Sequence, residues 1–137
     1  MSHPLMDVIS LGKQPPPCDS LIKIEMNQVS EGIAEAVWTP DEQMLNGNGV
    51  IMGGFISSAA DVVIAYAISS LVNEKQTFAS VNLTTTFHRP ALPGQINVTA
   101  IVKKFGKTMS YVTAELMQNG KLVASAASSV LVQEVND

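Results

Sequence analysis

A single carboxylate interrupts the longest apolar stretch of the sequence. Residues 49–73 contain only one charged side chain, Asp61. A buried carboxylate is costly unless it is paired or hydrogen-bonded, and no basic residue lies within one helical turn of it. The hydroxyls of Ser57 and Ser58 could satisfy it, or it could reach water at an oligomer interface, and either would make its role structural. Burial also shifts a carboxyl pKa toward that of a general base, so Asp61 is equally a candidate for catalysis.

A glycine-rich segment, residues 46–54, leads directly into the same stretch. Glycines let a ligand or another backbone approach closely. The free N–H groups at a helix start favour a developing negative charge, as in an oxyanion hole, although a glycine-rich entry turn needs no function. Gly53 and Asp61 are about 12 Å apart along one helix. Two antiparallel helices from two chains would therefore bring both groups to one carbonyl more easily than one chain.

Other catalytic arrangements find little support. A Ser-His-Asp triad would need His88 as its base, because His3 lies in the expected tail. The lone Cys18 has no histidine nearby in the sequence and cannot form an internal disulfide. Two histidines and one cysteine also provide no metal cluster of the usual spacing, so we expect no metal.

The elements that must position these residues follow from hydrophobic periodicity. The apolar stretch predicts a helix from about Gly54 to Leu71, buried on most sides. Residues 1–19, with three consecutive prolines, predict an extended N-terminal segment. Alternating segments predict strands at Leu21–Val29, Gly32–Trp38, Phe78–Phe87, Gln95–Phe105, Met109–Gln118 and Leu122–Val132.

This order indicates an α+β fold in which an antiparallel sheet curls around one long central helix. A chain of 137 residues corresponds to a single domain, which we expect at residues 20–137. The composition, 46% hydrophobic and 15% charged, is that of a globular protein. No disulfide or metal is needed for a chain of this length to bury a core.

Charge and hydropathy restrict the partners. A net charge of −4 argues against nucleic acid. Residues 76–133 carry five basic side chains against Glu115 alone, which suits a small anionic ligand or simply a solvated face of strands.

Asp61, four serines and the lack of basic flanks argue against a membrane span at residues 49–73. The opening residues resemble no secretory signal, so we expect a cytoplasmic protein.

Together these residues resemble a known family, the hotdog-fold acyl-CoA thioesterases of the phenylacetic-acid-degradation (PaaI-like) type. The segment from Asn46 to Asp61 is similar to that family's N-x-x-G-x-x-H-G-G-x6-D pattern. The similarity continues through Ser80-Val81-Asn82-Leu83, Phe87-His88-Arg89-Pro90-Ala91, Pro93-Gly94, Gly106-Lys107-Thr108 and Gly120-Lys121-Leu122-Val123-Ala124. It extends over about residues 20–133, nearly the whole chain.

The resemblance implies hydrolysis of an acyl-CoA thioester in a homodimer or homotetramer, with no cofactor beyond the coenzyme A of the substrate. The Gly53 N–H would polarise the carbonyl, and Asp61 of the partner subunit would act as general base or nucleophile. Asn46 would place the water or thioester, and Ser80 would support Asp61 or the water. Substrate contacts are expected from Met52, Gly54, Arg89, Lys103, Lys104 and Lys107, the last four toward the phosphates of coenzyme A.

One residue departs from the family pattern. Met52 stands where the pattern has histidine, and a methionine neither donates a hydrogen bond nor transfers a proton. It favours an apolar wall near the acyl group. It also keeps open an alternative function, a hotdog protein that binds acyl-CoA without hydrolysing it. A dehydratase acting on a thioester is a further alternative, but it would usually pair a histidine with the acid.

Overall fold

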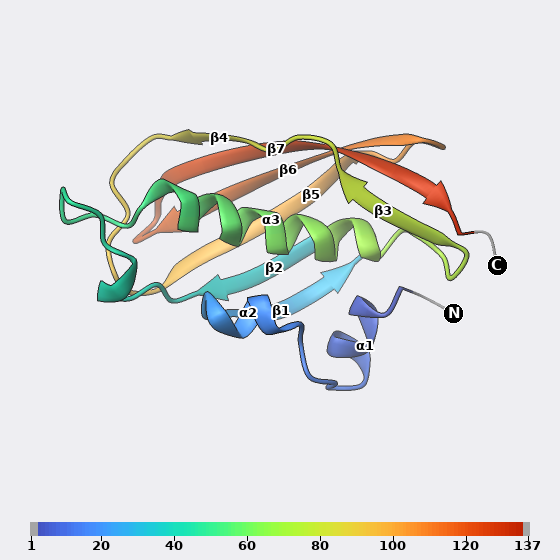
Figure 1. The fold of residues 1–137 in the computed structure, drawn as a ribbon, viewed down its shortest axis with the longest axis horizontal. Coiled ribbons are helices and arrows are strands. Elements are labelled where there is room, and N and C mark those ends of the chain that lie inside the picture. Colours follow the sequence, from blue (N-terminus) through green and yellow to red (C-terminus); the bar gives the residue numbers. More distant parts are fainter. Residues whose placement is uncertain (1–2, 136–137) are drawn as a thin grey trace.

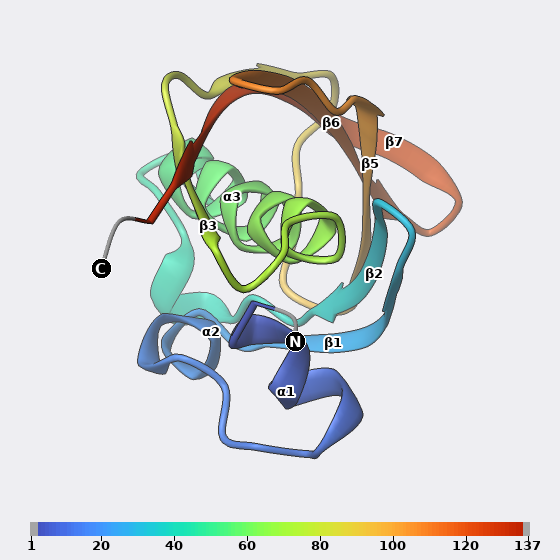
Figure 2. The ribbon, with the colours of Figure 1, turned by 90° about the vertical axis from the view of Figure 1, so that its right-hand side faces the viewer.

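A long helix lies across the concave face of a curled antiparallel sheet in the computed structural model, which describes residues 3–135 (Figure 1). The helix, α3, spans Gly53–Ser69. Viewed along its length, the sheet wraps around it from β3 over β7 and β6 to β2 and β1 (Figure 2). The predicted α+β hotdog architecture is therefore confirmed.

Seven strands form one sheet. Their hydrogen-bonded order is β1-β2-β5-β6-β7-β3, and β4 also pairs with β7. All pairings are antiparallel. The strands are β1 (Ile24–Ser30), β2 (Ile33–Trp38), β3 (Gln76–Ser80), β4 (Thr84–Phe87), β5 (Ile96–Lys104), β6 (Met109–Gln118) and β7 (Lys121–Glu134).

The core lies between α3 and the concave face of the sheet. Alternate residues of β5, β6 and β7 are buried, as the period of two predicts. Small and β-branched side chains of α3 pack against them and leave one exposed stripe on the helix, formed by Gly54, Ser58 and Asp61. The helix is thus buried on most sides, but the side with Asp61 is open in a single chain. Among the described residues no helix combines the length and hydropathy needed to cross a membrane.

The expected strand Phe78–Phe87 is in fact two strands. Ser80 pairs with Val130 and Thr84 with Ala127, so three residues oppose two on β7 and the register shifts by one. Asn82 stabilises this irregularity, because its side-chain oxygen accepts the Ser129 N–H at 3.0 Å. The extra residue acts as a bulge, which breaks the ladder and divides the segment into β3 and β4.

The prediction of an extended segment over residues 1–19 is wrong for the part that the structure describes. Residues Leu5–Ser10 form α1 and Pro17–Leu21 form α2. Outside this segment, between β2 and α3, Glu42–Met44 form a short 3-10 helix. Proline is well suited to the first helical position, and Pro17 begins α2. Side chains of α1 also pack against the core, namely Leu5, Met6, Val8 and Ile9. The prolines therefore introduce a helix here rather than prolong an extended chain.

Candidate functional site

Asn46 organises the loop that leads into α3. Its backbone N–H donates to the Val50 carbonyl at 2.8 Å. Its side-chain oxygen accepts the N–H groups of Asn48 at 2.9 Å and Val50 at 3.3 Å. Gly49 adopts a φ of 76° within this turn, where glycine is favoured. The side-chain NH₂ of Asn46 takes no part in these loop bonds, so it can serve a ligand.

Gly53 begins α3, and its N–H is one of the first in the helix, which have no acceptor within the helix itself. Nearby is a cavity of about 410 Å³, which we call the Gly53 cavity. A Cβ on Gly53 would lie 2.8 Å from Cζ of Phe87, so any other residue here would require that ring to shift. The Gly53 cavity is lined by Asn46, Val50, Ile51, Gly53, Ile56, Phe87, His88, Arg89, Pro90 and Ala91.

Two basic side chains from the segment after β4 lie at this cavity. A ring nitrogen of His88, Nε2, is 2.9 Å from the Ser125 hydroxyl. Arg89 donates from Nη1 to the Leu122 carbonyl at 3.0 Å, which fixes its guanidinium against β7. The Gly53 cavity therefore combines helix N–H groups, an amide and a guanidinium. These are suitable partners for a carbonyl oxygen and an anion.

Asp61 lines a separate cavity of about 290 Å³ between α3 and β3, the Asp61 cavity. Ser80, at the end of β3, lines the same cavity. Burial raises the pKa of Asp61 above its ordinary value of 3.8. The complete lining is Leu5, Pro16, Cys18, Asp19, Asp61, Val62, Ala65, Tyr66, Phe78, Ala79 and Ser80.

The two serines that could have satisfied Asp61 have other partners. Ser57 donates to the Thr85 hydroxyl at 2.8 Å, and Ser58 donates to the Gly54 carbonyl at 2.9 Å. The purely structural explanation of Asp61 through these hydroxyls is therefore wrong. Asp61 instead lines the Asp61 cavity from the exposed stripe of α3, and partial burial raises its pKa. A carboxyl with a raised pKa beside a cavity is a candidate for acid–base chemistry.

The expected substrate-binding residues are divided between distant places. Arg89 lines the Gly53 cavity, whereas Met52 is 45% exposed and lines neither cavity. Lys103 and Lys104 are exposed at the far end of β5, next to the C-terminal end of α3, and Lys107 lies in the following turn. Within one chain, the structure does not bring these lysines to Arg89, and their contact with phosphates stays a prediction.

Several lining residues were not predicted from the sequence. Phe87 and Ala91 line the Gly53 cavity, while Leu5 and Pro16 line the Asp61 cavity. The N-terminal residues were missed because the segment was expected to be extended. The apolar spacing of Leu5, Met6, Val8 and Ile9 is the signal that could have indicated a packed helix.

Metal ligands do not gather at either cavity. Within residues 3–135, no three side chains of His, Cys, Asp or Glu are grouped so that they could hold a metal ion. The expectation of a metal-free site stays a prediction.

The family follows from comparison with known proteins. The model of the thioesterase superfamily matches residues 48–125, a segment that contains all of α3. This chain belongs to the thioesterase superfamily. The acyl-coenzyme A thioesterase PaaI of Escherichia coli is 34% identical over 111 residues, which span 78% of this chain and 76% of that protein. The predicted resemblance to PaaI-type thioesterases is therefore confirmed.

Solved structures agree with this family assignment. The E. coli PaaI protein from the phenylacetic acid degradation operon superposes with a TM-score of 0.77 at 30% identity, covering 83% of this chain and 86% of that one. A phenylacetic acid degradation-related protein from Ralstonia eutropha gives 0.86 at 25% identity, with 93% and 98% covered. A relative from Pseudomonas aeruginosa is 34% identical over 88 residues, and this chain spans 66% of its length. Membership of this superfamily supports thioester hydrolysis.

Proposed function

We propose that this chain hydrolyses acyl-CoA thioesters at sites that are each built from two copies of the chain. The observation that carries the proposal is the separation of Gly53 and Asp61. The two residues line different cavities of one chain and lie about 12 Å apart along α3. A helix N-terminus and a carboxylate at this spacing cannot act on one carbonyl unless a second α3 supplies one of them.

The surface next to Asp61 suits such a second copy. β3 is the terminal strand of the sheet, and within residues 3–135 it pairs with β7 alone, so its outer edge can accept a strand of another chain. Next to it are the exposed stripe of α3 and Val81, which is 60% exposed, while Phe87, 51% exposed, lies farther along at the Gly53 end of α3. A symmetric interface over this region would cover apolar surface and bring two α3 helices together.

In the assembled site each group has a defined chemical task. The Gly53 N–H donates to the thioester oxygen and stabilises the negative charge that develops there. Asp61 of the other chain takes a proton from water, whose oxygen adds to the carbonyl carbon. The carbon–sulfur bond then breaks, and coenzyme A leaves as a thiolate that takes up a proton. Alternatively, Asp61 itself attacks the carbonyl and water then hydrolyses the anhydride that forms.

Asn46, Ser80 and Arg89 support this chemistry. The free NH₂ of Asn46 positions the thioester or the water in the Gly53 cavity, and Ser80 holds the water beside Asp61. Arg89, which lines the Gly53 cavity, meets the phosphates of coenzyme A. Both expected substrate groups, a neutral acyl chain and a polyanionic carrier, thereby find partners of suitable chemistry.

The test is release of free thiol from a panel of acyl-CoAs with short, long and aromatic acyl groups. We expect turnover of at least one substrate at enzyme concentrations far below that of the substrate. Stoichiometric binding without thiol release across the whole panel would contradict hydrolysis.

A second candidate function, acyl-CoA binding without hydrolysis, is favoured by one observation. Met52 precedes Gly53 where the family pattern has histidine, so the start of α3 lacks a side chain that can donate or transfer a proton. Because Met52 lines neither cavity, a methionine here instead of a histidine leaves the N–H of Gly53 and the carboxylate of Asp61 in place. The thiol-release panel distinguishes the two functions directly.

A further inference from the structure

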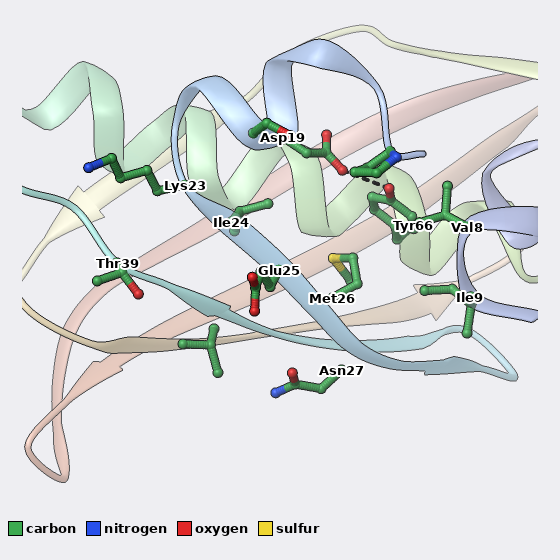
Figure 3. Close-up of a pocket in the computed structure, with 13 residues that line it drawn as sticks. Val8, Ile9, Asp19, Lys23, Ile24, Glu25, Met26, Asn27, Thr39 and Tyr66 are labelled. Atoms are coloured by element: carbon green, nitrogen blue, oxygen red, sulfur yellow. Dashed lines mark hydrogen bonds between the residues drawn. The ribbon is translucent and has the colours of Figure 1, made fainter. Parts of the chain in front are cut away.

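The Asp61 cavity shares one wall with a larger cavity beneath the N-terminal helices. This second space, about 680 Å³, lies between β1 and the segment that carries α1 and α2, and we call it the N-terminal cavity (Figure 3). Asp19 and Tyr66 line both cavities. The N-terminal cavity is lined by Val8, Ile9, Pro15, Asp19, Ser20, Lys23, Ile24, Glu25, Met26, Asn27, Val37, Thr39 and Tyr66.

A hydrogen bond joins the two shared residues. The Tyr66 hydroxyl, from α3, donates to Oδ2 of Asp19, from α2, at 2.6 Å (Figure 3). Both residues are almost fully buried, Asp19 at 2% exposed and Tyr66 at 1%. Burial and the neighbouring carboxylate raise the pKa of Tyr66, so its hydroxyl keeps the proton that it donates. Lys23 lines the N-terminal cavity but pairs with Asp41, so the Asp19 carboxylate depends on other donors.

The Asp61 cavity has the character of an acyl pocket. Leu5, Val62 and Phe78 supply apolar walls. Asp61 and Ser80 supply polar groups, and Asp19 and Tyr66 are hydrogen-bonded to each other. An apolar cavity of about 150 Å³ accepts benzene in another protein, so about 290 Å³ suits one aromatic ring or a short alkyl chain. A longer chain that extends from Asp61 toward α2 would have to pass the Asp19–Tyr66 bond to enter the N-terminal cavity.

We propose that the Asp19–Tyr66 hydrogen bond is the end wall of the acyl pocket and restricts the substrate to compact acyl groups. The inference rests on the proposed function, because it takes the group beside Asp61 to be the acyl part of an acyl-CoA. It assigns a role in specificity to the two N-terminal helices. α2 supplies Asp19, and α1 supplies Leu5 and Val8 to the linings of the two cavities. Asp19 and Tyr66 are thus specificity-determining residues that take no part in bond cleavage.

The test compares the acyl-length profile of the wild type with that of Asp19→Ala/Tyr66→Phe. The double variant removes both polar groups together, so no buried donor or acceptor is left without its partner. We expect kcat/KM for dodecanoyl-CoA, relative to butanoyl-CoA, to rise at least about tenfold as the two cavities join. Asp19→Asn is the matched control, since its amide oxygen still accepts the Tyr66 hydroxyl, and its profile should equal that of the wild type. A profile of the folded double variant that matches the wild type would overturn the inference.

Two further measurements keep the outcomes separate. If the double variant fails to fold, Tyr66→Phe alone must raise the same kcat/KM ratio by roughly threefold. An unchanged ratio would overturn the proposal that the Asp19–Tyr66 hydrogen bond ends the acyl pocket. If the wild type releases no thiol from any acyl-CoA, the proposed hydrolysis fails. The wall is then tested by calorimetric binding of the same acyl-CoAs to wild type and double variant. An unchanged ratio of dissociation constants overturns it, and a tenfold relative gain for dodecanoyl-CoA supports it.

Discussion

The two cavities along α3 differ in how completely one chain builds them. At the N-terminal end, a hydrogen-bonded loop, the helix start and the segment after β4 converge on Gly53. Around Asp61, eight residues further on, the carboxylate lies on an exposed helix stripe beside the free edge of β3. The first cavity has helix N–H groups and an amide held in place by one chain, whereas the second has its carboxylate at a surface that one chain leaves exposed. Under the proposed function, the two cavities of one chain belong to two different sites, and the same partner chain completes both of them.

The largest effect should follow from removing the base. Asp61→Asn keeps the size of the side chain but removes its charge and its capacity to accept a proton. We expect thiol release to fall by about 10² to 10⁴ fold, the usual value of positioned acid–base catalysis. Single-turnover thiol release measures this effect. Ser58→Ala, on the same exposed stripe and with its hydroxyl bonded to the Gly54 carbonyl, is the control and should stay within about twofold.

A smaller loss is expected at the Gly53 cavity from Asn46→Asp. The new carboxylate still accepts the N–H groups of Asn48 and Val50, so the loop is retained, but the NH₂ donor is lost. We expect kcat/KM to fall by about 10² to 10³ fold, as for one lost oxyanion-hole donor, with little change in melting temperature. A variant that loses its melting transition as well would show that Asn46 acts only through the loop.

The positive charges provide a weaker contrast. Arg89 lines the Gly53 cavity, while Lys103 is exposed at the other end of the sheet. Arg89→Ala should raise KM for an acyl-CoA by roughly fivefold at low salt, the effect of about 1 kcal/mol, and leave kcat nearly unchanged. Lys75→Ala is a surface control. Equal KM values for Arg89→Ala and the control would remove Arg89 from the anion site, and Lys103→Ala tests the lysine prediction in the same assay.

The smallest effect concerns stability and pH. Because the folded state raises the pKa of Asp61 above 3.8, the ionised form is less favoured in the fold than in the unfolded chain. Ionised Asp61 therefore lowers stability once the pH exceeds its folded pKa, and this penalty disappears below 3.8. Thermal unfolding of Asp61→Asn should show a slightly higher melting temperature than wild type at pH 7 and an equal one near pH 3. A lower melting temperature at pH 7 would mean that the charge is satisfied in the fold.

Local patterns sufficed for much of this structure. The period of two located β1, β2, β5, β6 and β7, and the apolar stretch located α3 within one or two residues of its bounds. The split between β3 and β4 was not predictable, because it depends on how Asn82 meets β7, a contact between segments 47 residues apart. α1 is stabilised by packing of its apolar side chains on the core, which their spacing could have indicated. α2 was missed because the prolines before it favour an extended chain as well as a helix start.

The candidate site shows the same division. Asp61 and Gly53 could be proposed as site residues from the sequence because a charge in an apolar helix and a glycine pair at its start are local signals. The partition into two cavities, and the wall made by Asp19 with Tyr66, required tertiary structure. The lysines were grouped with Arg89 by their charge alone, although the fold places them at opposite ends of the sheet.

The most direct test of the composite site is complementation between two inactive chains. Gly53→Val blocks the helix N-terminus beneath Phe87, and Asp61→Asn removes the base. After both variants are mixed and allowed to exchange subunits, each mixed pair contains one site with intact Gly53 and intact Asp61. Random pairing should then restore about a quarter of wild-type thiol release, because half of the pairs are mixed and one of their two sites is whole. If the mixture stays as inactive as the separate variants although mixed pairs form, each site lies within one chain and the account is wrong.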